Sequence, residues 1–452
     1  MARTLAAVAK ELDARLIGAD SDFRAVSIDT RELVDGDLFV AVRGDNYDGN
    51  DFVADAHARG AAGALVTRRA DIELPQVKVK DTRLAFGQIA RAWRDNFGIP
   101  VVAVTGSNGK TTVKELIASI LSCRRNVCVT EGNLNNDLGV PLTLMRLADE
   151  HEALVAELGA NHAGEIDYLS RLVQPTVGVI TNAGAAHLEG FKSIAGVATA
   201  KGELLDHLPR AGTAIINADD RYCSEWKTRS RAETVLTFGF GNGADCTVTG
   251  DVLTEVSGSR FTLQLPEGEH VDIELPLAGE HNVRNALAAA AASFAVGINS
   301  NDIVSGLNSA HAVKGRLNVL HGKSGAAVID DSYNANPGSV KAALDYLASA
   351  GGKRVLILGD MAELGNDAEA LHREIGSYAA GRCDALLTLG PLSRNAGDAF
   401  GSAAQSIDDV GDLGIAVEAL LSEGVTILIK GSRVMGLDRL VDLLKSDEVA
   451  RC

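Results

Sequence analysis

The chain has 452 residues, a formal net charge of −17 at pH 7 and 46% hydrophobic residues. At roughly 150 residues per domain, this length indicates about three domains, each large enough to bury a full core. The acidic excess is not offset by a basic patch, which argues against nucleic acid as a partner. A site for small anionic substrates would therefore need its own local positive charge.

Six cysteines are spread along the chain without a Cys-x-x-Cys pair. We therefore expect neither structural zinc nor a disulfide framework, and the reduced thiols of a cytoplasmic protein fit this usage best. Residues 1–16 carry charges throughout and are not typical of a signal peptide. The longest uncharged apolar run, residues 286–298, is too short to cross a bilayer and is predicted to be a buried helix. We expect a cytoplasmic protein that does not insert into a membrane, and a monomer.

Residues 1–98 are predicted to form a small N-terminal α/β domain, because short apolar runs alternate with Asp/Gly turns before a helix pattern. The strand-like runs lie at residues 38–42, 64–66 and 77–79, and the helix pattern covers residues 83–97. Gly98, Ile99 and Pro100 are predicted to join this domain to the next one.

Residues 101–121 combine a strand, a glycine-bearing loop and a helix in the order that a phosphate-binding loop requires. The chain reads TGSNGKTT between the apolar residues 101–104 and the helix pattern at residues 113–121. Gly106 and Gly109 allow the backbone to curl so that its N–H groups point at phosphate oxygens. This segment predicts a nucleotide site.

The residues of this loop fit ATP with a divalent cation. Lys110 would set its ammonium group against the terminal phosphates, and the Thr111 hydroxyl would bind Mg²⁺. The common phosphate-loop pattern, G-x-x-x-x-G-K-[ST], has a glycine six positions before the lysine, where this chain has Val104. The form T-G-x-N-G-K-T found here is more typical of ATP-dependent amide ligases than of GTPases. We predict that ATP is bound by residues Gly106, Ser107, Asn108, Gly109, Lys110, Thr111 and Thr112.

Residues 99–313 are predicted to form a central domain with a mostly parallel sheet and helices on both faces, because apolar runs alternate with helix patterns. Further strands are expected at residues 153–156, 177–181 and 213–217. Glu157 directly follows one of these strands, where its carboxylate could bind the metal of the phosphate loop. His187 lies in the loop after the next strand, where a neutral imidazole could bind a second cation. Both residue types also occur as ordinary solvated side chains.

Lys201 falls on the apolar side of a predicted amphipathic helix. Apolar residues stand seven and four positions before it and three, four and seven positions after it. Burial would lower the pKa of its amine, and a neutral amine can react with CO₂ to form a carbamate, which offers two oxygens to a metal. The lysine could instead extend to the surface, and spacing alone favours that alternative.

Residues 314–452 are predicted to form a second doubly wound sheet, Rossmann-like, with ligands at the carboxyl ends of its strands. These strands are expected at residues 354–358, 385–389 and 426–429. The sequence GDMAELG after the first of them lacks the spacing G-x-G-x-x-G, so no nicotinamide cofactor is predicted.

Four polar residues elsewhere are candidates for nucleotide contacts. Asn282 and Asn285 stand at the start of the buried helix, where amides could meet the donor and acceptor of an adenine edge. Asn282 could instead be the N-cap of that helix. Arg316, near the joint to the last domain, could reach the γ-phosphate. Asp331 ends a predicted strand and is a candidate for contact with the ribose or with the incoming amine.

Taken together, these motifs resemble the Mur ligase family, the ATP-dependent amide ligases of peptidoglycan synthesis. The matching strings are TGSNGKTTVKE (105–115), GNLNNDLGVPLTL (132–144), ELGANHAGEIDYL (157–169), NAGAAHLEGF (182–191), AKGE (200–203), GEHNVRNALAA (279–289), DDSYNANP (330–337) and LGDMAELG (358–365). Within the family, the chain most resembles the member that joins D-alanyl-D-alanine to UDP-N-acetylmuramoyl-tripeptide. This narrower resemblance rests on NLNND followed by GVP, and on SYNANP.

The resemblance implies roles for the residues around the phosphate loop. Lys110 and Thr111 would hold the phosphates and Mg²⁺, Glu157 and His187 would bind metal at two sites, and Lys201 would be the family's carbamylated lysine. Catalytic roles are implied for Lys110, Lys201, His187 and Arg316. Contacts with adenine are implied for Asn282 and Asn285, and contacts with the nucleotide from the last domain for Arg316 and Asp331.

The resemblance also implies where the other substrates lie. SIDTR (27–31) and RGDNYDGNDF (43–52) look like the uridine nucleotide site. The implied contacts are Ser27, Thr30, Arg31, Asp45 and Asn46 with the uridine nucleotide, Asn135 and Asn136 with the sugar-peptide, and Asn334 and Asn336 with the dipeptide. Two positions depart from the family pattern, since this chain has Asn50 where DGHDF is usual and Lys192 where a glycine is usual.

The implied reaction begins when a peptide carboxylate attacks the γ-phosphate of ATP, and the resulting acyl phosphate is then attacked by the amine of D-alanyl-D-alanine. The last domain should close to exclude water, with hinges near residues 98 and 314. The alternatives are an amino-acid-adding ligase or folylpolyglutamate synthetase, or a regulatory module that binds ATP without ligation. Such a module would not need Glu157, His187 and Lys201.

Overall fold

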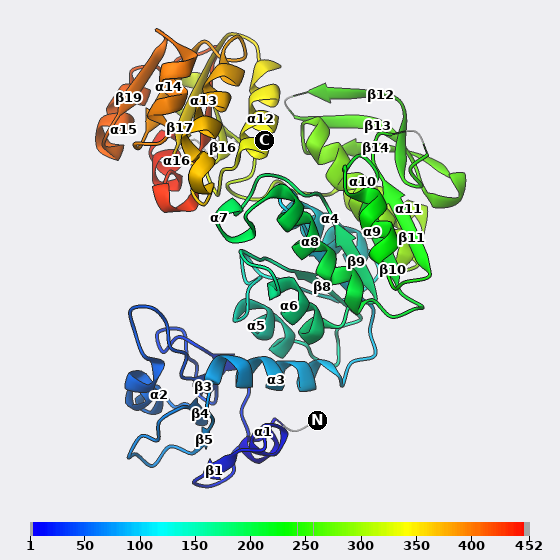
Figure 1. Ribbon diagram of the computed structural model, residues 1–452, viewed down its shortest axis with the longest axis vertical. Helices are drawn as coiled ribbons and strands as arrows, with labels where there is room; N and C mark the ends of the chain where they lie inside the picture. Colours follow the sequence, from blue (N-terminus) through cyan, green and yellow to red (C-terminus); the bar gives the residue numbers. More distant parts are fainter. Residues whose placement is uncertain (1–2, 242, 256, 447–452) are drawn as a thin grey trace.

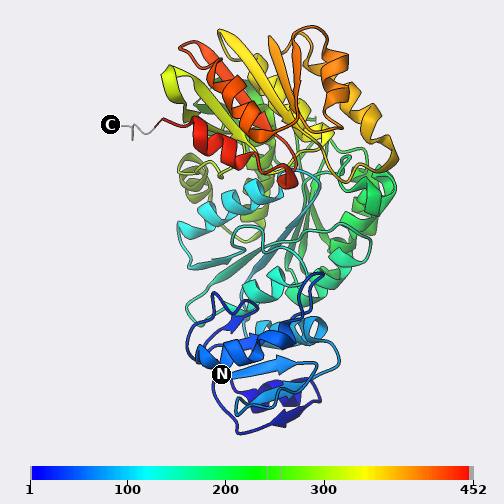
Figure 2. The same cartoon turned by 90° about the vertical axis from the view of Figure 1, so that its left-hand side faces the viewer.

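The computed structural model describes residues 3–241, 243–255 and 257–446. Within these ranges the chain forms an elongated molecule with its N-terminal part at one end, a large central part, and its C-terminal part at the other end (Figure 1). Figure 2 shows the same order from the side. Cys452, one of the cysteines expected to be reduced, and the first two residues of the predicted charged N-terminal stretch lie outside the described residues.

The N-terminal part contains a mixed sheet with strand order β1-β5-β4-β3-β2, in which β1 is antiparallel to β5 and the other pairs are parallel. Its strands are β1 (Arg15–Ile17), β2 (Val26–Ser27), β3 (Leu38–Val40), β4 (Gly63–Val66) and β5 (Gln76–Lys78). Its helices are α1 (Leu5–Glu11), the short 3-10 turn η1 (Gly49–Phe52), α2 (Val53–Ala58) and α3 (Thr82–Arg94). Helix α3 lies between this sheet and the central part (Figure 1).

The central part is built on a parallel sheet with strand order β11-β10-β9-β6-β8-β7. Its strands are β6 (Val101–Thr105), β7 (Val127–Val129), β8 (Ala153–Glu157), β9 (Val177–Ile180), β10 (Thr213–Asn217) and β11 (Thr234–Phe238). Its helices are α4 (Lys110–Ser122), α5 (Gly139–Met145), α6 (Glu165–Val173), α7 (Leu188–Phe191), α8 (Ile194–Gly202), the 3-10 turn η2 (Glu203–His207), α9 (Cys223–Arg229), α10 (Glu280–Ala295) and α11 (Ser300–Asn308).

The alternating side chains of β6 explain why this sheet is covered on both faces. Val101 and Ala103 belong to the same core as residues of α5, α6 and α8, whereas Val102 and Val104 pack with residues of α4, α10 and α11. A strand buried on both sides reads as a nearly continuous apolar run. The first four residues of β6 are apolar, and the hydroxyl of its last residue, Thr105, donates to the Leu158 carbonyl at 2.8 Å. None of the helices described in the chain has both the length and the apolar character needed to span a membrane.

An antiparallel sheet with strand order β12-β13-β14 follows the parallel one and packs near α10 and α11 (Figure 1). Its elements are β12 (Thr247–Glu255), β13 (Gly258–Gln264), the turn η3 (Pro266–Gly268) and β14 (His270–Leu275). The sequence patterns did not predict this sheet. Its strands are partly exposed and polar, so they lack the continuous apolar runs that marked the parallel strands.

The C-terminal part has a doubly wound sheet with strand order β15-β16-β20-β17-β18-β19, in which only the pairing of β15 with β16 is antiparallel among the described pairs. Its strands are β15 (Asn318–His321), β16 (Ala327–Asp331), β17 (Lys353–Gly359), β18 (Ala385–Leu389), β19 (Ala404–Ile407) and β20 (Val425–Lys430). Its helices and turns are η4 (Lys323–Gly325), α12 (Pro337–Ala348), η5 (Gly365–Asp367), α13 (Ala368–Ala379), α14 (Arg394–Phe400), α15 (Val410–Glu418), η6 (Arg433–Met435) and α16 (Asp438–Leu444).

The predicted fold class is confirmed: the described chain is α/β, with a parallel central sheet and a second doubly wound sheet after it. The predicted boundaries at residues 98 and 314 stay predictions. Residue 98 lies between β5 and β6, and residue 314 lies between α11 and β15.

Gly306 offers a test of the packing that supports the phosphate-loop helix. A Cβ atom added at Gly306 of α11 would collide with the Ile120 backbone of α4, lying 2.7 Å from its nitrogen. We expect Gly306→Ala to destabilise the protein by about 1–3 kcal/mol, because two packed helices must separate. Calorimetry should show a lowered melting temperature.

The matched control is Gly414→Ala in α15, where a Cβ would meet no atom within 4 Å. Alanine favours a helix over glycine by about 1 kcal/mol, so the melting temperature should stay the same or rise. If both variants melt alike, the close packing of α4 against α11 does not limit stability.

Candidate active site

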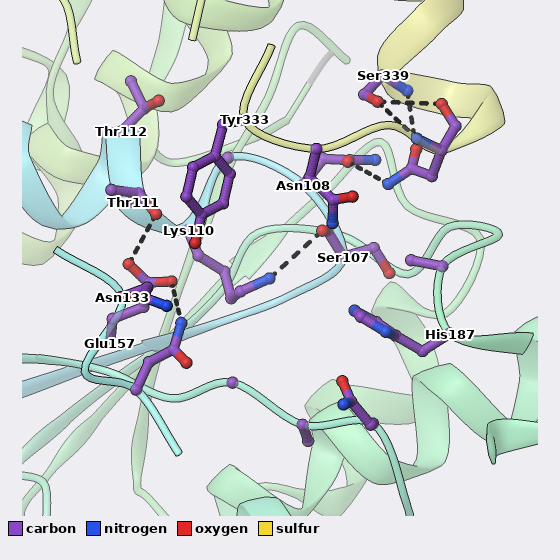
Figure 3. A pocket seen from close by; sticks show the side chains of 18 of the residues that line it. Ser107, Asn108, Lys110, Thr111, Thr112, Asn133, Glu157, His187, Tyr333 and Ser339 are labelled. Atoms are coloured by element: carbon purple, nitrogen blue, oxygen red, sulfur yellow. Dashed lines mark hydrogen bonds between the residues drawn. The ribbon is translucent and has the colours of Figure 1, made fainter. Parts of the chain in front are cut away.

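A cavity of about 1150 Å³ opens where all three parts of the chain meet. Its wall includes the first turn of α3, the loops after β6, β8 and β9, the start of α10, and loops of the C-terminal part. Because β6 lies between β8 and β9 and runs parallel to both, their carboxyl ends bring these loops to the same edge. Figure 3 shows Lys110, Glu157, His187 and Tyr333 around this hollow.

Most of the predicted site residues line this cavity. The predicted residues in its wall are Ser107, Asn108, Gly109, Lys110, Thr111, Thr112, Asn135, Asn136, Glu157, His187, Asn282, Asn285, Arg316, Asp331, Asn334 and Asn336. The predicted residues outside the wall are Gly106, Lys201, Ser27, Thr30, Arg31, Asp45 and Asn46. The structure therefore brings most of the nucleotide and metal candidates together with the sugar-peptide and dipeptide candidates, but not the uridine candidates.

The phosphate loop depends on glycine at two positions. Gly106 and Gly109 have φ angles of +147° and +82°, which L side chains rarely adopt. A Cβ at Gly106 would collide with the Thr181 hydroxyl, and a Cβ at Gly109 would collide with the Asn285 side-chain oxygen. Both the curl of the loop and its close approach to neighbouring loops therefore require glycine here.

The loop is tied to the segment that follows β9. The Asn108 N–H donates to Asn182 Oδ1 at 3.0 Å, and the Thr181 hydroxyl donates to the Asn108 carbonyl at 2.6 Å. Lys110 Nζ donates back to the Gly106 carbonyl at 2.7 Å. Burial lowers the pKa of Lys110, and the nearby Arg316 charge acts in the same direction. The loop thus concentrates positive charge in an acidic protein, as binding of phosphates requires.

Thr111 and Glu157 form the oxygen-rich corner of the cavity. The Thr111 hydroxyl donates to Glu157 Oε2 at 2.8 Å (Figure 3), and Asn135 Nδ2 donates to Glu157 Oε1 at 2.7 Å. Glu157 is 1% exposed. A hydroxyl beside a buried carboxylate is a donor set that suits Mg²⁺, so these residues fit the predicted metal.

His187 contacts the C-terminal part of the chain. Its Nδ1 lies 2.5 Å from Glu363 Oε2, and the backbone N–H of Glu189 donates to the Glu363 carbonyl at 3.2 Å. Burial lowers the pKa of His187, whereas the Glu363 carboxylate opposes that shift. Among the described residues, no three His, Cys, Asp or Glu side chains are grouped as a metal cluster.

Lys201 is buried, so the alternative in which it extends to the surface is wrong. It is 1% exposed, and its Nζ has one hydrogen bond among the described residues, a long one of 3.4 Å to the Ala160 carbonyl. Burial lowers the pKa of Lys201 to about 7, with a further contribution from the charge of Lys110. It lies directly behind Ala160, which lines the cavity.

The candidates for nucleotide contact line the cavity beside the phosphate loop, since the Asn285 side chain lies against Gly109. Asn285 Nδ2 donates to Asn282 Oδ1 at 3.2 Å, and Asn282 Nδ2 donates to the Ala278 carbonyl at 2.8 Å. Asn282 is not the N-cap of α10, because Gly279 occupies that position. The Arg316 guanidinium lies 4.4 Å from the centre of the Tyr333 ring. These side chains are held in place within the cavity wall.

Asp331 is held by a lysine that the sequence analysis missed. Lys430 Nζ lies 2.5 Å from Asp331 Oδ2 and donates to the Asn334 carbonyl at 2.9 Å. Burial raises the pKa of Asp331, and the Lys430 ammonium opposes that shift. Lys430 ends β20 at the carboxyl edge of the C-terminal sheet, and this position after a predicted strand is the signal that could have identified it.

Asn336 links the C-terminal part to the phosphate loop. Its Nδ2 donates to Asn108 Oδ1 at 2.7 Å, and its Oδ1 accepts from the Ser339 N–H at 2.9 Å as the cap of α12. Both polar atoms of this side chain are therefore engaged in the structure. Its predicted contact with the dipeptide stays a prediction.

The uridine candidates lie in the N-terminal part and outside the cavity wall. The Ser27 hydroxyl donates to the Asp29 carbonyl at 2.8 Å, and Arg31 Nη2 lies 2.5 Å from Asp29 Oδ2. That ion pair holds the pKa of Asp29 at about 2.

The two departures from the family pattern have local explanations. Asn50 is buried, and its Nδ2 donates to Asp48 Oδ1 at 2.7 Å and to the Thr67 hydroxyl at 2.9 Å. Lys192 has a φ of +68°, a conformation that glycine adopts more easily than lysine. Asn50 is thus a buried link in the N-terminal part, and Lys192 occupies a position that favours glycine.

Five further residues of the cavity wall were given no role in the sequence analysis, although all of them except Arg83 lie within the strings that resemble the family. They are Arg83, Asp137, Tyr168, His281 and Tyr333. His281 shows what such residues can contribute, since its Nε2 is buried without a hydrogen-bond partner among the described residues. Burial lowers its pKa to about 4, so its imidazole is neutral.

Comparisons with known proteins give one consistent result. The Mur ligase family catalytic domain matches residues 22–94, the Mur ligase middle domain residues 104–293, and the Mur ligase glutamate ligase domain residues 315–433. The chain is 45% identical over 448 residues to the UDP-N-acetylmuramoyl-tripeptide–D-alanyl-D-alanine ligase of Escherichia coli (strain K12), covering 98% of both.

Two solved structures share this architecture. One is the UDP-N-acetylmuramoylalanyl-D-glutamyl-2,6-diaminopimelate–D-alanyl-D-alanyl ligase from Acinetobacter baumannii, with a TM-score of 0.88, 36% identity and 98% of both chains covered. The other is the MurF ligase from Thermotoga maritima in complex with ADP, with a TM-score of 0.84 and 27% identity, covering 93% of this chain and 96% of that one.

Gly109→Ala tests whether the loop geometry supports nucleotide binding. We expect the variant to lose ATP affinity by about tenfold or more, because backbone strain and the collision with Asn285 both distort the loop. Titration calorimetry with ATP and Mg²⁺ measures the effect.

Gly164→Ala is the matched control, since Gly164 also precedes a helix with a φ of +86° but a Cβ there would meet no atom within 4 Å. Its ATP affinity should change much less. Equal losses in both variants would mean that strain alone, and not the fit of this loop, was measured.

Proposed function

The chain belongs to the Mur ligase family, and we propose that it is the ATP-dependent ligase that joins D-alanyl-D-alanine to UDP-N-acetylmuramoyl-tripeptide in the cytoplasmic stage of peptidoglycan synthesis. The observation that carries this proposal is 45% identity to the E. coli ligase over 98% of both sequences. The phosphate loop and Glu157, on one cavity wall with residues of the C-terminal part, supply the site that such a reaction needs.

The alternatives predict different acceptors. An amino-acid-adding ligase would use a single amino acid, and a folylpolyglutamate synthetase would use glutamate. A regulatory module that binds ATP alone would have no need of three metal-site residues, Glu157, His187 and Lys201. These features favour a catalytic site over simple binding.

ATP would lie against the phosphate loop, with its adenine towards Asn282 and Asn285 and its terminal phosphates at Lys110 and Arg316. Thr111 and Glu157 would hold Mg²⁺, which when bound supplies positive charge against the phosphates. We propose that His187 and a carbamate on Lys201 complete a second metal site. The burial of Lys201 and its pKa near 7 support the carbamate, since only a neutral amine reacts with CO₂.

The proposed reaction has two steps. The peptide carboxylate attacks the γ-phosphate of ATP and gives an acyl phosphate and ADP; the amine of D-alanyl-D-alanine then attacks the carbonyl carbon and phosphate leaves. Lys110 and Arg316 would offset charge on the transferring phosphoryl group. Asp331, held by Lys430, would face the nucleotide or the incoming amine.

Water must be excluded while the acyl phosphate exists. Contacts between the central and C-terminal parts at Asn336–Asn108 and Glu363–His187 support closure of the C-terminal part over the site. We also propose that the chain has three domains with boundaries at residues 98 and 314, and that hinges lie near these two boundaries. We propose that the protein is a monomer.

The other substrates would approach from the two ends of the cavity. Ser27, Thr30, Arg31, Asp45 and Asn46 would bind the uridine nucleotide, Asn135 and Asn136 the sugar-peptide, and Asn334 with Asn336 the dipeptide. The A. baumannii relative is named for a peptide that contains 2,6-diaminopimelate, and it is 36% identical over 98% of both chains. We propose the same third residue for the peptide used here.

An assay of ADP release tests the proposed function. We expect release that depends on both UDP-N-acetylmuramoyl-tripeptide and D-alanyl-D-alanine, because the amine acceptor is needed to complete turnover. Single amino acids and glutamate are the control acceptors. Stimulation by one of them in place of the dipeptide would overturn the assignment.

Isotope labelling tests the carbamate on Lys201. With ¹³C-bicarbonate at pH 8 we expect one carbamate signal in the NMR spectrum, absent from Lys201→Ala and retained in Lys227→Ala, a variant of an exposed lysine. Because the pKa of Lys201 is about 7, the amine becomes an ammonium as the pH falls, so the signal should fade between pH 8 and 6.

Activity gives a second readout for the same residue. Lys201→Ala should abolish turnover, and short carboxylic acids should partly restore it by supplying the missing oxygens. Full activity without any addition, or a carbamate signal that survives in Lys201→Ala, would refute the proposal.

A further inference from the structure

Arg83, Asp137 and Tyr168 meet on the cavity wall from three separate elements. Arg83 lies in the first turn of α3, Asp137 lies just before α5, and Tyr168 lies on α6. Arg83 Nη1 is 2.6 Å from Asp137 Oδ2, and the two side chains are 41% and 39% exposed. This group, here called the Arg83 cluster, therefore faces the cavity and remains open to solvent.

The Tyr168 ring completes the cluster. Its hydroxyl lies against Gly87 of α3, where a side chain of any size would collide with it. Burial raises the pKa of Tyr168, and the carboxylate of Asp137 acts in the same direction. The hydroxyl is therefore a neutral hydrogen-bonding group close to Asp137.

The cluster has unused hydrogen-bonding capacity. A guanidinium has five N–H donors, yet within residues 3–241, 243–255 and 257–446 the Arg83 side chain has one hydrogen bond, to Asp137 Oδ2. In the same ranges Asp137 Oδ1 and the Tyr168 hydroxyl have no hydrogen-bond partner. A guanidinium and a carboxylate oxygen thus stand side by side, both free to bind a ligand.

The ion pair is not needed to attach α3 to the central part. Arg94 Nε already donates to the Val173 carbonyl at 3.1 Å, Arg91 Nη1 to the Arg171 carbonyl at 2.5 Å, and Trp93 Nε1 to the Leu147 carbonyl at 3.0 Å. An exposed ion pair adds only about 0–1 kcal/mol. Recognition of a ligand explains the position of Arg83 and Asp137 better than stability does.

The chemistry of the pair defines the ligand. A free guanidinium edge binds a carboxylate, and a free carboxylate oxygen binds an ammonium group. An α-amino acid group carries both charges on one carbon, so it can engage both partners at once. The side chain of 2,6-diaminopimelate ends in such a group, whereas the side chain of lysine ends in an ammonium alone.

The position of the cluster fits that assignment. Asn135, a proposed contact of the sugar-peptide, donates to Glu157 at 2.7 Å, at the corner proposed to hold the Mg²⁺ of the ATP that the peptide carboxylate attacks. Asp137 is two residues further along, at most about 7 Å in backbone reach. This span matches a residue whose main-chain carboxylate reacts near Glu157 while the end of its side chain lies at Asp137.

We propose that the Arg83 cluster is a subsite for the zwitterionic end of diaminopimelate in the peptide substrate, with Arg83 binding its carboxylate and Asp137 its ammonium group. The inference rests on the proposed function. Tyr168 supplies a further hydrogen bond beside Asp137. The subsite thereby selects a peptide that ends in diaminopimelate over one that ends in lysine.

The test compares kcat/KM for two UDP-N-acetylmuramoyl-tripeptides that differ only in carrying diaminopimelate or lysine as the third residue. The wild-type enzyme should prefer the diaminopimelate substrate, and Arg83→Met should reduce this preference by about tenfold or more, because a charge-assisted hydrogen bond is lost. Asp137→Asn should weaken use of both substrates, since both carry an ammonium group. Equilibrium binding of each substrate without ATP should show the same pattern.

Arg91→Met is the matched control, because Arg91 lies on the same helix and also bonds to the central part but is not in the cavity wall. Its preference should equal that of the wild type. An unchanged preference in Arg83→Met, or an equal loss for both substrates, would overturn the subsite. A failure of the proposed function is distinguishable, because neither tripeptide would then support D-alanyl-D-alanine-dependent ADP release in the wild type.

Discussion

The site depends on the pairing of three parallel strands, β8, β6 and β9. Val104 pairs with Glu157 and Thr105 pairs with Ile180, so the three strands end at the same level. The phosphate loop, the buried carboxylate and the loop that leads to His187 therefore emerge at one edge. A shift in register would turn inward-facing residues outward and would separate Thr111 from Glu157. The cavity of the ligase follows from this alignment.

The second constraint is electrostatic. An acidic chain places the buried Lys201 near the half-buried Lys110 of the phosphate loop and near Glu157. Burial lowers the pKa of both amines, and the charge of Lys110 lowers the pKa of Lys201 further. Bound phosphates would stabilise the positive charge of Lys110. A carbamate on Lys201 would remove the cost of a buried cation, because it replaces that cation with an anion. The two lysines therefore favour the binding of anionic groups at this edge of the cavity.

Much of the fold and part of the site could be predicted from the sequence, for physical reasons. Strands such as β10 and β18 are almost wholly buried, so short runs of mostly apolar residues predicted both strands with the bounds that the structure shows. The residues of the phosphate loop are consecutive in the chain, so a short sequence motif was enough to predict it. The pairing of Arg83 with Asp137 joins residues 54 positions apart, and the contact of Asn336 with Asn108 spans 228. Such contacts depend on how helices and domains dock, which no local pattern encodes.

The central claim is that ATP and the peptide carboxylate react directly with each other at the shared strand edge. The most direct measurement uses a tripeptide substrate labelled with ¹⁸O in its reacting carboxylate, followed by mass spectrometry of the phosphate released. The account predicts one labelled oxygen in each phosphate, because the acyl carbon–oxygen bond breaks when the amine attacks. Phosphate without label would show that the carboxylate never attacked ATP, and would contradict the account.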